Sequence, residues 1–162
     1  MNKIIILFGV SGCGKSTIGE ALSKKTSIPF FDADDFHPTA NVLKMKTGSP
    51  LTDADRLPWL IALNKKLLQE SKKGGAILAC SALKESYREI LREGLAKIPT
   101  WVLLNGTFDF ILHRINSREG HFMPTSLLQS QFDTLEVPEY ALSVDVRKSV
   151  EVLVEEILRN EQ

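Results

Sequence analysis

Eight consecutive residues, Gly9–Ser16, carry the clearest chemical signal in this chain. They read Gly-Val-Ser-Gly-Cys-Gly-Lys-Ser, which fits the pattern G-x-x-x-x-G-K-S. The apolar run Ile4–Phe8 precedes them, so we expect a buried strand to lead into the turn and a helix to follow it. Glycines let a backbone close around an anion, and the N–H groups of such a turn point at phosphate oxygens. The pattern therefore predicts a nucleoside triphosphate site, against the alternative of a chance glycine-rich turn.

Two side chains of this loop are expected to act on the triphosphate directly. Lys15 adds a positive charge for the β- and γ-phosphates, and the hydroxyl of Ser16 is placed to ligate Mg²⁺. We therefore predict that Lys15 is catalytic and that Ser16 is a metal ligand. The whole predicted triphosphate-binding set is Gly9, Val10, Ser11, Gly12, Cys13, Gly14, Lys15, Ser16 and Thr17.

A group of aspartates follows the next apolar segment, Pro29–Phe31. A kinase needs a positioned base to accept the proton of the attacking hydroxyl, and one of these carboxylates could serve. We predict Asp34 as this base and as a contact to the acceptor. Asp32 is expected to have a structural role or to hold a metal-bound water. The alternative is a solvated acidic turn without a catalytic role.

Two further residues could bind the acceptor, His37 and Arg56. His37 could hydrogen-bond a substrate hydroxyl, although a His before a Pro is also common in turns. Arg56 falls in the first turn of a predicted helix, where the helix dipole favours acidic residues such as Asp53 and Asp55. A cation is unexpected at that position, which favours a functional role for Arg56.

Two pairs of arginines, each spaced four residues apart, are the remaining cationic candidates. Arg88 or Arg92 could bind an acceptor carboxylate through the guanidinium fork, and we predict Arg88. Each of them also follows a glutamate by three residues, so surface ion pairs are an alternative. Arg114 and Arg118 end a helix that leads into residues 117–124. We predict that Arg114 contacts the nucleotide and that Arg118 stabilises the transferring charge when a lid closes.

Gln131 is a polar residue on an otherwise apolar stripe formed with Leu128, Phe132 and Leu135. A polar group on a buried face needs a hydrogen-bond partner. The acceptor could be that partner, and so could a backbone carbonyl. We include Gln131 among the predicted acceptor contacts.

Composition argues against several classes of protein. A length of 162 residues suits one domain, and a formal net charge of zero offers no basic footprint for nucleic acid. No apolar run reaches the roughly 18–20 residues of a membrane span, and the N-terminal apolar stretch is too short for a signal peptide. Cys13 and Cys80 do not make a disulfide framework, so we expect a reduced, cytoplasmic setting.

Strand and helix patterns alternate along the chain. The expected strands are Ile4–Phe8, Pro29–Phe31, Ala76–Cys80, Thr100–Leu104 and Ala141–Val144. The expected helices are Lys15–Lys25, Thr52 to about Lys72, Leu83–Glu93, the segment after Thr107, and Val150–Leu158. Buried strands separated by helices imply an α/β fold with a parallel five-stranded sheet, which binds ligands outside the carboxyl ends of its strands. The stretches 35–51 and 117–124 read as irregular and are candidate moving parts.

Beyond these local signals, nearly the whole chain resembles the gluconokinases. The resemblance rests on Gly9–Ser16, Asp32–Pro38, Asn41, Lys44, Met45 and Gly48–Leu60. It continues through Cys80–Lys84, Tyr87, Arg88, Gly120–Met123, Ser130–Phe132, Leu135 and Glu136. The later segments are specific to that family, whereas the first loop is shared by many. Two departures are small: Cys13 stands where a serine is familiar, and Ala33 stands where a glycine is.

The resemblance implies phosphorylation of D-gluconate on its 6-hydroxyl by ATP and Mg²⁺, giving 6-phospho-D-gluconate. It also implies a P-loop, nucleoside-monophosphate-kinase-like fold. Residues 1–162 would form a single kinase domain with a substrate-binding region at about 35–60 and a lid at about 117–125. A homodimer is a further implication. The hydroxyls of gluconate suit Asp34 and His37, and its carboxylate suits an arginine.

Four alternatives use the same first loop. Nucleoside monophosphate kinases would also need a pocket for a base, for which the sequence shows no signature. Shikimate kinases share an Asp-x-Asp after the second strand, but a run of glycines is expected after the third, where this chain has Cys80–Ala82. A GTP-dependent switch would need Asn-Lys-x-Asp, and Asn64–Leu67 lacks the acid. A regulatory protein that binds ATP without catalysis is disfavoured by Lys15, Ser16 and Asp34.

Overall fold

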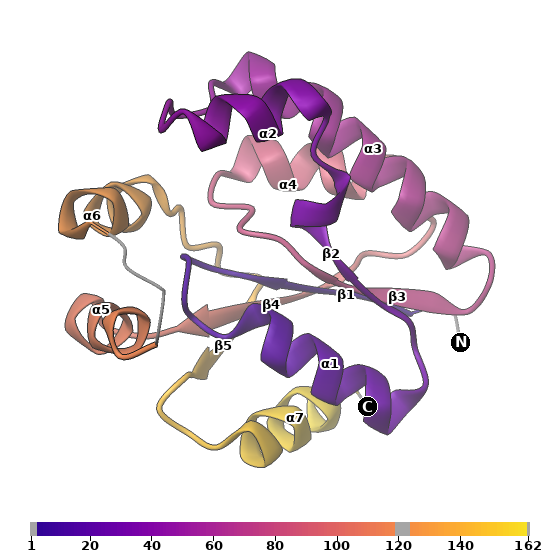
Figure 1. Ribbon diagram of the computed structural model, residues 1–162. Coiled ribbons are helices and arrows are strands. Elements are labelled where there is room, and N and C mark those ends of the chain that lie inside the picture. The colour runs from indigo at the N-terminus through magenta and orange to yellow at the C-terminus, as the bar shows by residue number, and fades with distance from the viewer. Residues whose placement is uncertain (1–2, 119–123, 162) are drawn as a thin grey trace.

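The computed structural model describes residues 3–118 and 124–161 and has one sheet with helices on both faces (Figure 1). The strands are β1 (Lys3–Phe8), β2 (Phe30–Asp32), β3 (Gly75–Ala79), β4 (Thr100–Asn105) and β5 (Leu142–Asp145). The helices are α1 (Lys15–Thr26), α2 (Thr39–Lys46), α3 (Asp53–Ser71), α4 (Glu85–Arg92), α5 (Phe108–Asn116), α6 (Thr125–Thr134) and α7 (Val150–Arg159), with a 3₁₀ helix η1 (Ala33–Phe36) after β2. All neighbouring strands pair in parallel in the order β2-β3-β1-β4-β5, which confirms the expected five-stranded parallel sheet.

β1 is the central strand of this sheet. It pairs with β3 on one side and with β4 on the other, so Ile6 lies opposite both Leu78 and Trp101. Both β1 and β3 are buried along nearly their whole length, which explains why they read as continuous apolar runs rather than as alternating patterns.

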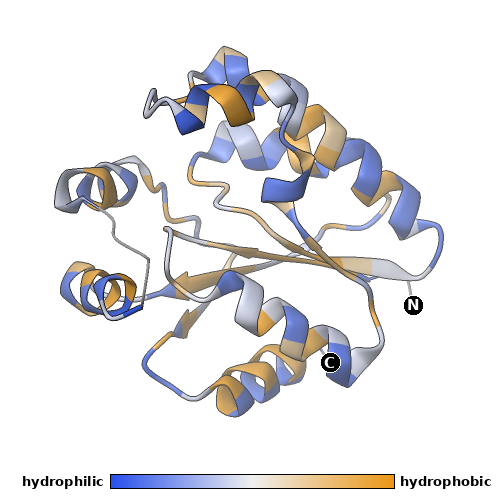
Figure 2. Cartoon of the chain, viewed as in Figure 1, coloured by the Kyte–Doolittle hydropathy of each residue, from blue (hydrophilic) through white to orange (hydrophobic). Residues whose placement is uncertain are grey.

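Successive side chains of β1 enter two separate cores because they point to opposite faces of the sheet. Ile5 and Leu7 pack in the core shared with α1, α5 and α7. Ile4, Ile6 and Phe8 pack in the core shared with α3 and α4. Figure 1 shows α1 and α7 on one side of the sheet and α2, α3 and α4 on the other, and Figure 2 shows that the strands between them are apolar.

The helix α3 begins with a capping box that also joins it to α2. The Thr52 hydroxyl accepts a hydrogen bond from the backbone N–H of Asp55, and the Asp55 carboxylate accepts one from the backbone N–H of Thr52. Lys44 of α2 lies 2.6 Å from the same carboxylate. The hydrogen bond from Lys44, followed by that from Thr52, lowers the pKa of Asp55 to about 2. These contacts fix the part of α3 that carries Arg56.

The helix α2 and the second half of the 3₁₀ helix η1 lie in the stretch 35–51, which we expected to be irregular. The apolar residues Leu43 and Met45 of α2 are exposed, so the sequence of this helix lacks the apolar periodicity of a core-facing helix. A polar side chain anchors α2 instead: the buried Asn41 donates a hydrogen bond from Nδ2 to the Asp55 carbonyl at 2.9 Å. Tertiary hydrogen bonding therefore stabilises a helix that periodicity alone does not predict.

The structure bears on two further features of the chain, its helix lengths and the predicted lid. Within residues 3–118 and 124–161, no helix combines the length and the apolar character that crossing a membrane requires. Most of the predicted lid, together with the Gly120–Met123 motif, lies outside the described residues. Only its flanks, the end of α5 and the start of α6, are described, and α5 and α6 lie side by side beyond one end of the sheet (Figure 1).

Candidate active site

A pocket with a volume of about 930 Å³ lies at the carboxyl ends of the strands. It is bounded by the loop after β1, the acidic turn after β2, the segment that joins α2 to α3, the loop after β3, and α6. Its wall includes Ser11, Gly12, Gly14, Lys15, Ser16, Thr17, Asp32, Asp34, His37, Arg56, Trp59, Ser81, Lys84, Tyr87, Arg118 and Gln131. Most of the predicted site residues are thus brought together from distant parts of the chain, as the position of ligands in parallel sheets leads us to expect.

The loop Gly9–Ser16 wraps over the end of β1 in a backbone conformation that requires glycine. Gly12 has a φ of +77°, and a Cβ placed on it would lie 2.3 Å from a carbon of Ile115. Val10 and Cys13 point into the core, with 2% and 1% of their surface exposed. Of the predicted triphosphate-binding residues, these two and Gly9 do not line the pocket, so any contact that they make with a ligand would be through the backbone.

Lys15 and Ser16 begin α1 at the mouth of this loop. The Lys15 ammonium donates to the carbonyls of Gly9 at 3.1 Å and Val10 at 3.0 Å, which holds the charge over the loop. The Ser16 hydroxyl donates to Asp32 Oδ2 at 3.0 Å. Asp32 thereby connects the start of α1 to the acidic turn.

The acidic turn is held in place by its own first residue and by α3. Asp32 Oδ1 accepts the backbone N–H of Asp34 at 3.0 Å, which caps η1, and Trp59 Nε1 donates to the Ala33 carbonyl at 2.7 Å. Asp34 lines the pocket on the far side of these bonds. Desolvation by the surrounding protein, and then the neighbouring charge of Asp32, raise the pKa of Asp34 above its ordinary value. A carboxylate with a raised pKa is better suited to accept a proton than an ordinary surface aspartate.

His37 lies flat against Trp59, with ring centroids 4.2 Å apart and an angle of 13° between the rings. Its Nδ1 is 3.3 Å from the amide Nδ2 of Asn41. Because that amide nitrogen is a donor, Nδ1 serves as the acceptor and the neutral ring carries its proton on Nε2. Burial, opposed by the charge of Asp34, lowers the pKa of His37. A neutral ring with a free N–H suits a contact to a hydroxyl oxygen.

A cationic corner is built from Arg56 of α3 and Lys84 of the loop after β3. Arg56 Nη1 donates to the Leu51 carbonyl at 2.7 Å, and its guanidinium lies 5.7 Å from the centre of the Tyr87 ring. The Lys84 ammonium lies 3.4 Å from the Asp53 carboxylate, which also accepts the Tyr87 hydroxyl. Arg56, Lys84 and Tyr87 line the pocket, whereas Asp53 lies behind them. The corner offers an anionic group two cations whose positions the protein already holds.

Arg88 does not belong to this corner, which corrects our expectation that it binds the acceptor. Its guanidinium is 1% exposed, is not part of the pocket wall, and donates to the carbonyls of Ala82 and Glu136, each at 2.8 Å. Its Nε donates to Glu85 at 3.0 Å. With its donors used within the protein, Arg88 instead ties the loop after β3 to the segment after α6. Neighbouring Ala82 has a φ of +39°, so this loop is held in a conformation that non-glycine residues rarely adopt.

The arginine within α5, Arg114, and the one just beyond it, Arg118, differ in their relation to the pocket. Arg118 lines the pocket. Arg114 does not; its guanidinium donates to the carbonyls of Cys13 at 3.4 Å and Val146 at 3.1 Å and lies over the ring of Phe110. The predicted contact of Arg114 with a nucleotide stays a prediction, since these bonds use only some of its five donors.

Gln131 finds a partner that we had not considered, the phosphate loop itself. Its Oε1 accepts the backbone N–H of Ser11 at 2.7 Å, and its Nε2 donates to the Ser11 hydroxyl at 3.0 Å. The residue lines the pocket, so a contact with the acceptor stays a prediction. Within the protein, the partner that a polar residue on an apolar stripe requires is thus the backbone N–H and hydroxyl of Ser11, and not a backbone carbonyl.

Among the pocket-lining residues that were not predicted as site residues are Trp59, Lys84 and Tyr87. Trp59 and Tyr87 fall at core positions of their helices, so periodicity assigns them to packing, and both are indeed largely buried. Lys84 ends the loop between β3 and α4, and its position at the ligand edge of the sheet was the signal that could have identified it.

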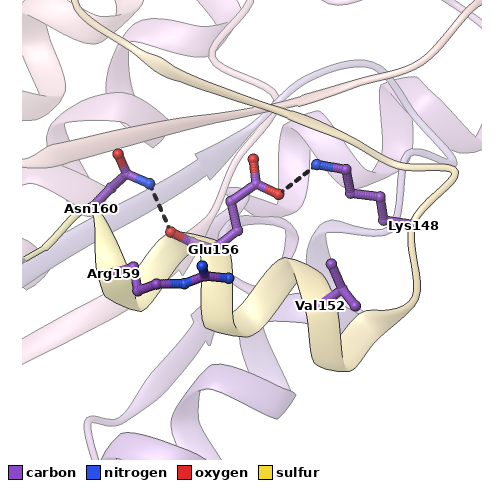
Figure 3. Close-up of a pocket in the computed structure, with 5 residues that line it drawn as sticks. All are labelled: Lys148, Val152, Glu156, Arg159 and Asn160. Atoms are coloured by element: carbon purple, nitrogen blue, oxygen red, sulfur yellow. Dashed lines mark hydrogen bonds and ion pairs between the residues drawn. The ribbon is translucent and has the colours of Figure 1, made fainter.

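A second, shallower hollow of about 430 Å³ lies on the outer face of α7 (Figure 3). Its wall comprises Lys148, Val152, Glu156, Arg159 and Asn160. Lys148 is paired with Glu156 at 2.8 Å, and Asn160 bonds the Glu156 carbonyl at 2.8 Å, so its polar groups are engaged with each other. The larger pocket at the strand ends, which contains the phosphate loop and the acidic turn, is the candidate active site.

Comparisons with known proteins show which proteins this chain is similar to. A family model described as shikimate kinase matches residues 11–150. The chain is 45% identical over 164 residues to a gluconokinase of Gluconobacter oxydans (strain 621H), covering 99% of this chain and 92% of that protein. It is 47% identical over 135 residues to the thermosensitive gluconokinase of Escherichia coli (strain K12), covering 83% and 72%. The crystal structure of a gluconokinase from Sinorhizobium meliloti 1021 matches with a TM-score of 0.88 at 42% identity, covering 98% of this chain and 90% of that one.

The buried position of Arg88 predicts a stability defect on substitution. Arg88→Met leaves the Ala82 and Glu136 carbonyls without their donor, and we expect the free energy of unfolding to fall by about 3–5 kcal/mol. Denaturant unfolding measures this change. Arg92→Met is the matched control, because Arg92 contacts the same Glu85 at 2.9 Å from a more exposed position and should cost about 0–1 kcal/mol. Unchanged stability of Arg88→Met, with weaker acceptor binding, would restore Arg88 as a ligand.

Proposed function

This chain belongs to the gluconokinase family, and we propose that it transfers the γ-phosphoryl group of ATP to the 6-hydroxyl of D-gluconate, giving 6-phospho-D-gluconate and ADP. The single observation that carries the proposal is the shared pocket in which Lys15, Asp34 and Arg56 converge. The first residue suits a triphosphate, the second an attacking hydroxyl and the third a carboxylate. A small sugar acid has the last two groups at opposite ends of one molecule.

The loop Gly9–Ser16 is assigned to the triphosphate. Its N–H groups and the start of α1 favour negative charge, and Lys15 can leave the carbonyls of Gly9 and Val10 for the phosphates without moving the backbone. In the transition state, charge spreads over the oxygens of the transferring group, and a cation held in place lowers the barrier. We assign Arg118 the same role from the opposite wall and Arg114 a contact to the nucleotide.

A magnesium ion fits the mouth of this loop. The Ser16 hydroxyl and the Asp32 carboxylate, 3.0 Å apart, are hard oxygen groups of the kind that Mg²⁺ prefers. In residues 3–118 and 124–161, no group of three or more His, Cys, Asp or Glu side chains is placed to hold a metal. That suits Mg²⁺, which takes few protein ligands alongside waters and phosphate oxygens. When bound, the ion would neutralise charge on the phosphates; we assign Ser16 as its ligand and Asp32 to a bound water.

Asp34 is the proposed base. Accepting the proton of the 6-hydroxyl raises the nucleophilicity of that oxygen as it approaches phosphorus. The neutral ring of His37 is assigned to a neighbouring hydroxyl through its Nε2–H. The cationic corner receives the carboxylate, with Arg56 as the primary ligand, and this assignment orients gluconate with its 6-hydroxyl toward Asp34.

The larger organisation remains part of the proposal. We assign residues 1–162 to one kinase domain, with a substrate-binding region at about 35–60 and a lid at about 117–125. The described parts of the first region support the assignment, because His37, Met45, Gly48–Leu51 and Arg56 line the pocket. A homodimer and a cytoplasmic location are further expectations from the family.

The first test is the activity itself. We expect ADP release that depends on gluconate and not on shikimate, neutral sugars or nucleoside monophosphates, measured in a coupled assay. Lys15→Ala should lower kcat/KM for gluconate on the order of 10²-fold or more, because a preorganised charge at the transferring group is lost. Greater turnover of shikimate than of gluconate would refute the acceptor assignment. A Lys15→Ala enzyme within about threefold of the parent would refute the role of the loop in catalysis.

The raised pKa of Asp34 predicts the acid limb of the pH profile. Only the ionised carboxylate accepts a proton, so kcat/KM should fall as the pH drops through the pKa of Asp34. That pKa lies above the ordinary aspartate value of roughly 3.9. Asp34→Asn should lower kcat by roughly 10²–10⁴-fold and remove this limb while ATP affinity is nearly unchanged. The lowered pKa of His37 could place a second titration nearby, and His37→Gln separates the two. If the limb disappears in His37→Gln and persists in Asp34→Asn, the base is not Asp34.

Arg56 should discriminate acids from neutral acceptors. Arg56→Lys keeps the charge but loses the fork, and we expect the KM for gluconate to rise by about tenfold to a hundredfold, the cost of a charged hydrogen bond. A neutral polyol that lacks the carboxylate is the control substrate. Its poor rate should be the same in the parent and in Arg56→Lys. Equal losses with both substrates would show that Arg56 acts only through its contacts to Leu51 and Tyr87.

A further inference from the structure

Gln131 and Ser11 form a two-point contact between α6 and the phosphate loop. The amide of Gln131 accepts the Ser11 N–H at 2.7 Å and donates to the Ser11 hydroxyl at 3.0 Å, so it engages the backbone and the side chain of the same residue. The two residues are 120 positions apart, both are partly buried, and both line the pocket. The contact therefore belongs to the tertiary structure of the site and not to the local geometry of either element.

The helix is the fixed partner in this contact. Leu128 of α6 is fully buried, and Phe132 packs edge-on against Phe108 of α5 with centroids 5.8 Å apart. Beyond the helix, the Glu136 N–H donates to the Leu83 carbonyl at 2.8 Å, and the Glu136 carbonyl accepts from Arg88 at 2.8 Å. Packing on one side and hydrogen bonds at the end thus hold the Gln131 amide in place.

Ser11 is the partner that needs positioning. It lies between Gly9 and Gly12, which have φ values of +144° and +77°. Glycines on both sides leave the intervening peptide with more freedom than other residues would allow. The side chains of neighbouring Val10 and Cys13 are buried, whereas Ser11 faces the pocket. Ser11 therefore forms the rim of the loop on the side that α6 and the acceptor region share.

We propose that Gln131 is a positioning residue for phosphoryl transfer, which fixes the peptide and hydroxyl of Ser11 at the rim over which the phosphoryl group passes to the acceptor. This inference rests on the proposed kinase reaction. Within the loop assigned to the triphosphate, the hydrogen bonds of Gln131 go to Ser11 alone and not to Lys15 or the start of α1. Loss of the Gln131 amide should therefore leave ATP affinity nearly intact and reduce the rate of the bound complex, since misalignment by about 1 Å can cost on the order of 10²-fold.

The central experiment compares Gln131→Met with Gln129→Met. Methionine keeps the length and flexibility of glutamine and removes both hydrogen bonds. In Gln131→Met we expect kcat to fall by roughly tenfold to 10²-fold, with the Kd for ATP within about threefold of the parent and an unchanged Tm. Gln129 lies on the same helix, is exposed, and bonds Asp133 at 2.8 Å away from the pocket. Gln129→Met should match the parent in kcat, Kd and Tm.

A second variant separates the two hydrogen bonds. Ser11→Ala removes the hydroxyl but keeps the backbone N–H, so it should lower kcat less than Gln131→Met does. The double variant should be no slower than Gln131→Met alone, because residues that act through one contact are not additive. Additive losses would mean that the two residues act separately, which would overturn the proposal.

Amide hydrogen exchange tests the contact without any reaction. The Ser11 N–H should exchange slowly in the parent and in Gln129→Met and faster in Gln131→Met. If the parent does not phosphorylate gluconate, the proposed function fails while this measurement still reports on the contact. If the parent is active, an unchanged kcat in Gln131→Met overturns the proposal. Tighter ATP binding at unchanged kcat would also overturn it, because the contact would then compete with phosphate for Ser11. A fall in Tm large enough to explain the fall in rate would overturn it as well.

Discussion

The closure of the phosphate loop over the end of β1 is the constraint on which the rest of this structure depends. The strand β1 is buried between two neighbours and leads through this loop into α1, and N–H groups at the start of a helix favour anions. Only glycine fits where the loop passes Ile115, and Val10 and Cys13 anchor the turn in the core below. Because β1 lies at the centre of the sheet, the loops after β2 and β3 end beside this turn. The positions of Asp32, Asp34 and Lys84 beside the loop follow from that placement.

Around the loop, the protein holds its charged groups with hydrogen bonds before any substrate arrives. Asp32 joins Ser16 to the backbone of Asp34, and Trp59 fixes the same turn from α3. Arg56 is held by the Leu51 carbonyl. Fixing these groups in the folded state removes the cost of ordering them during the reaction. Desolvation of Asp34 accompanies this arrangement and raises the pKa of the carboxylate that we propose as the base.

Polar contacts from α6 and from the segment that follows it reach both the phosphate loop and the loop after β3. Gln131 reaches the phosphate loop, and Glu136 reaches the loop after β3 with Arg88 as its partner. A buried guanidinium is tolerated only when its donors are used, and here carbonyls and Glu85 use them. The same contacts keep Ala82 in an unfavourable backbone conformation beside Lys84. The acceptor side of the site is thus supported by residues that do not themselves line it.

The sequence by itself determined the sheet, its buried strands and the phosphate loop, because apolar periodicity and glycine spacing are local properties of the chain. It also indicated which charged residues gather at the ligand edge, since parallel strands all end there.

Only the tertiary structure decided the partners of those charges. Arg88 and Arg56 are equally suited to a carboxylate as residues, but burial commits the first to backbone carbonyls and leaves the second in the pocket wall. Gln131 needed a partner on any reading, and a residue 120 positions away supplied it. The helix α2 was not predicted for a similar reason. A long-range hydrogen bond from Asn41 anchors it, and its own apolar residues do not pack in the core.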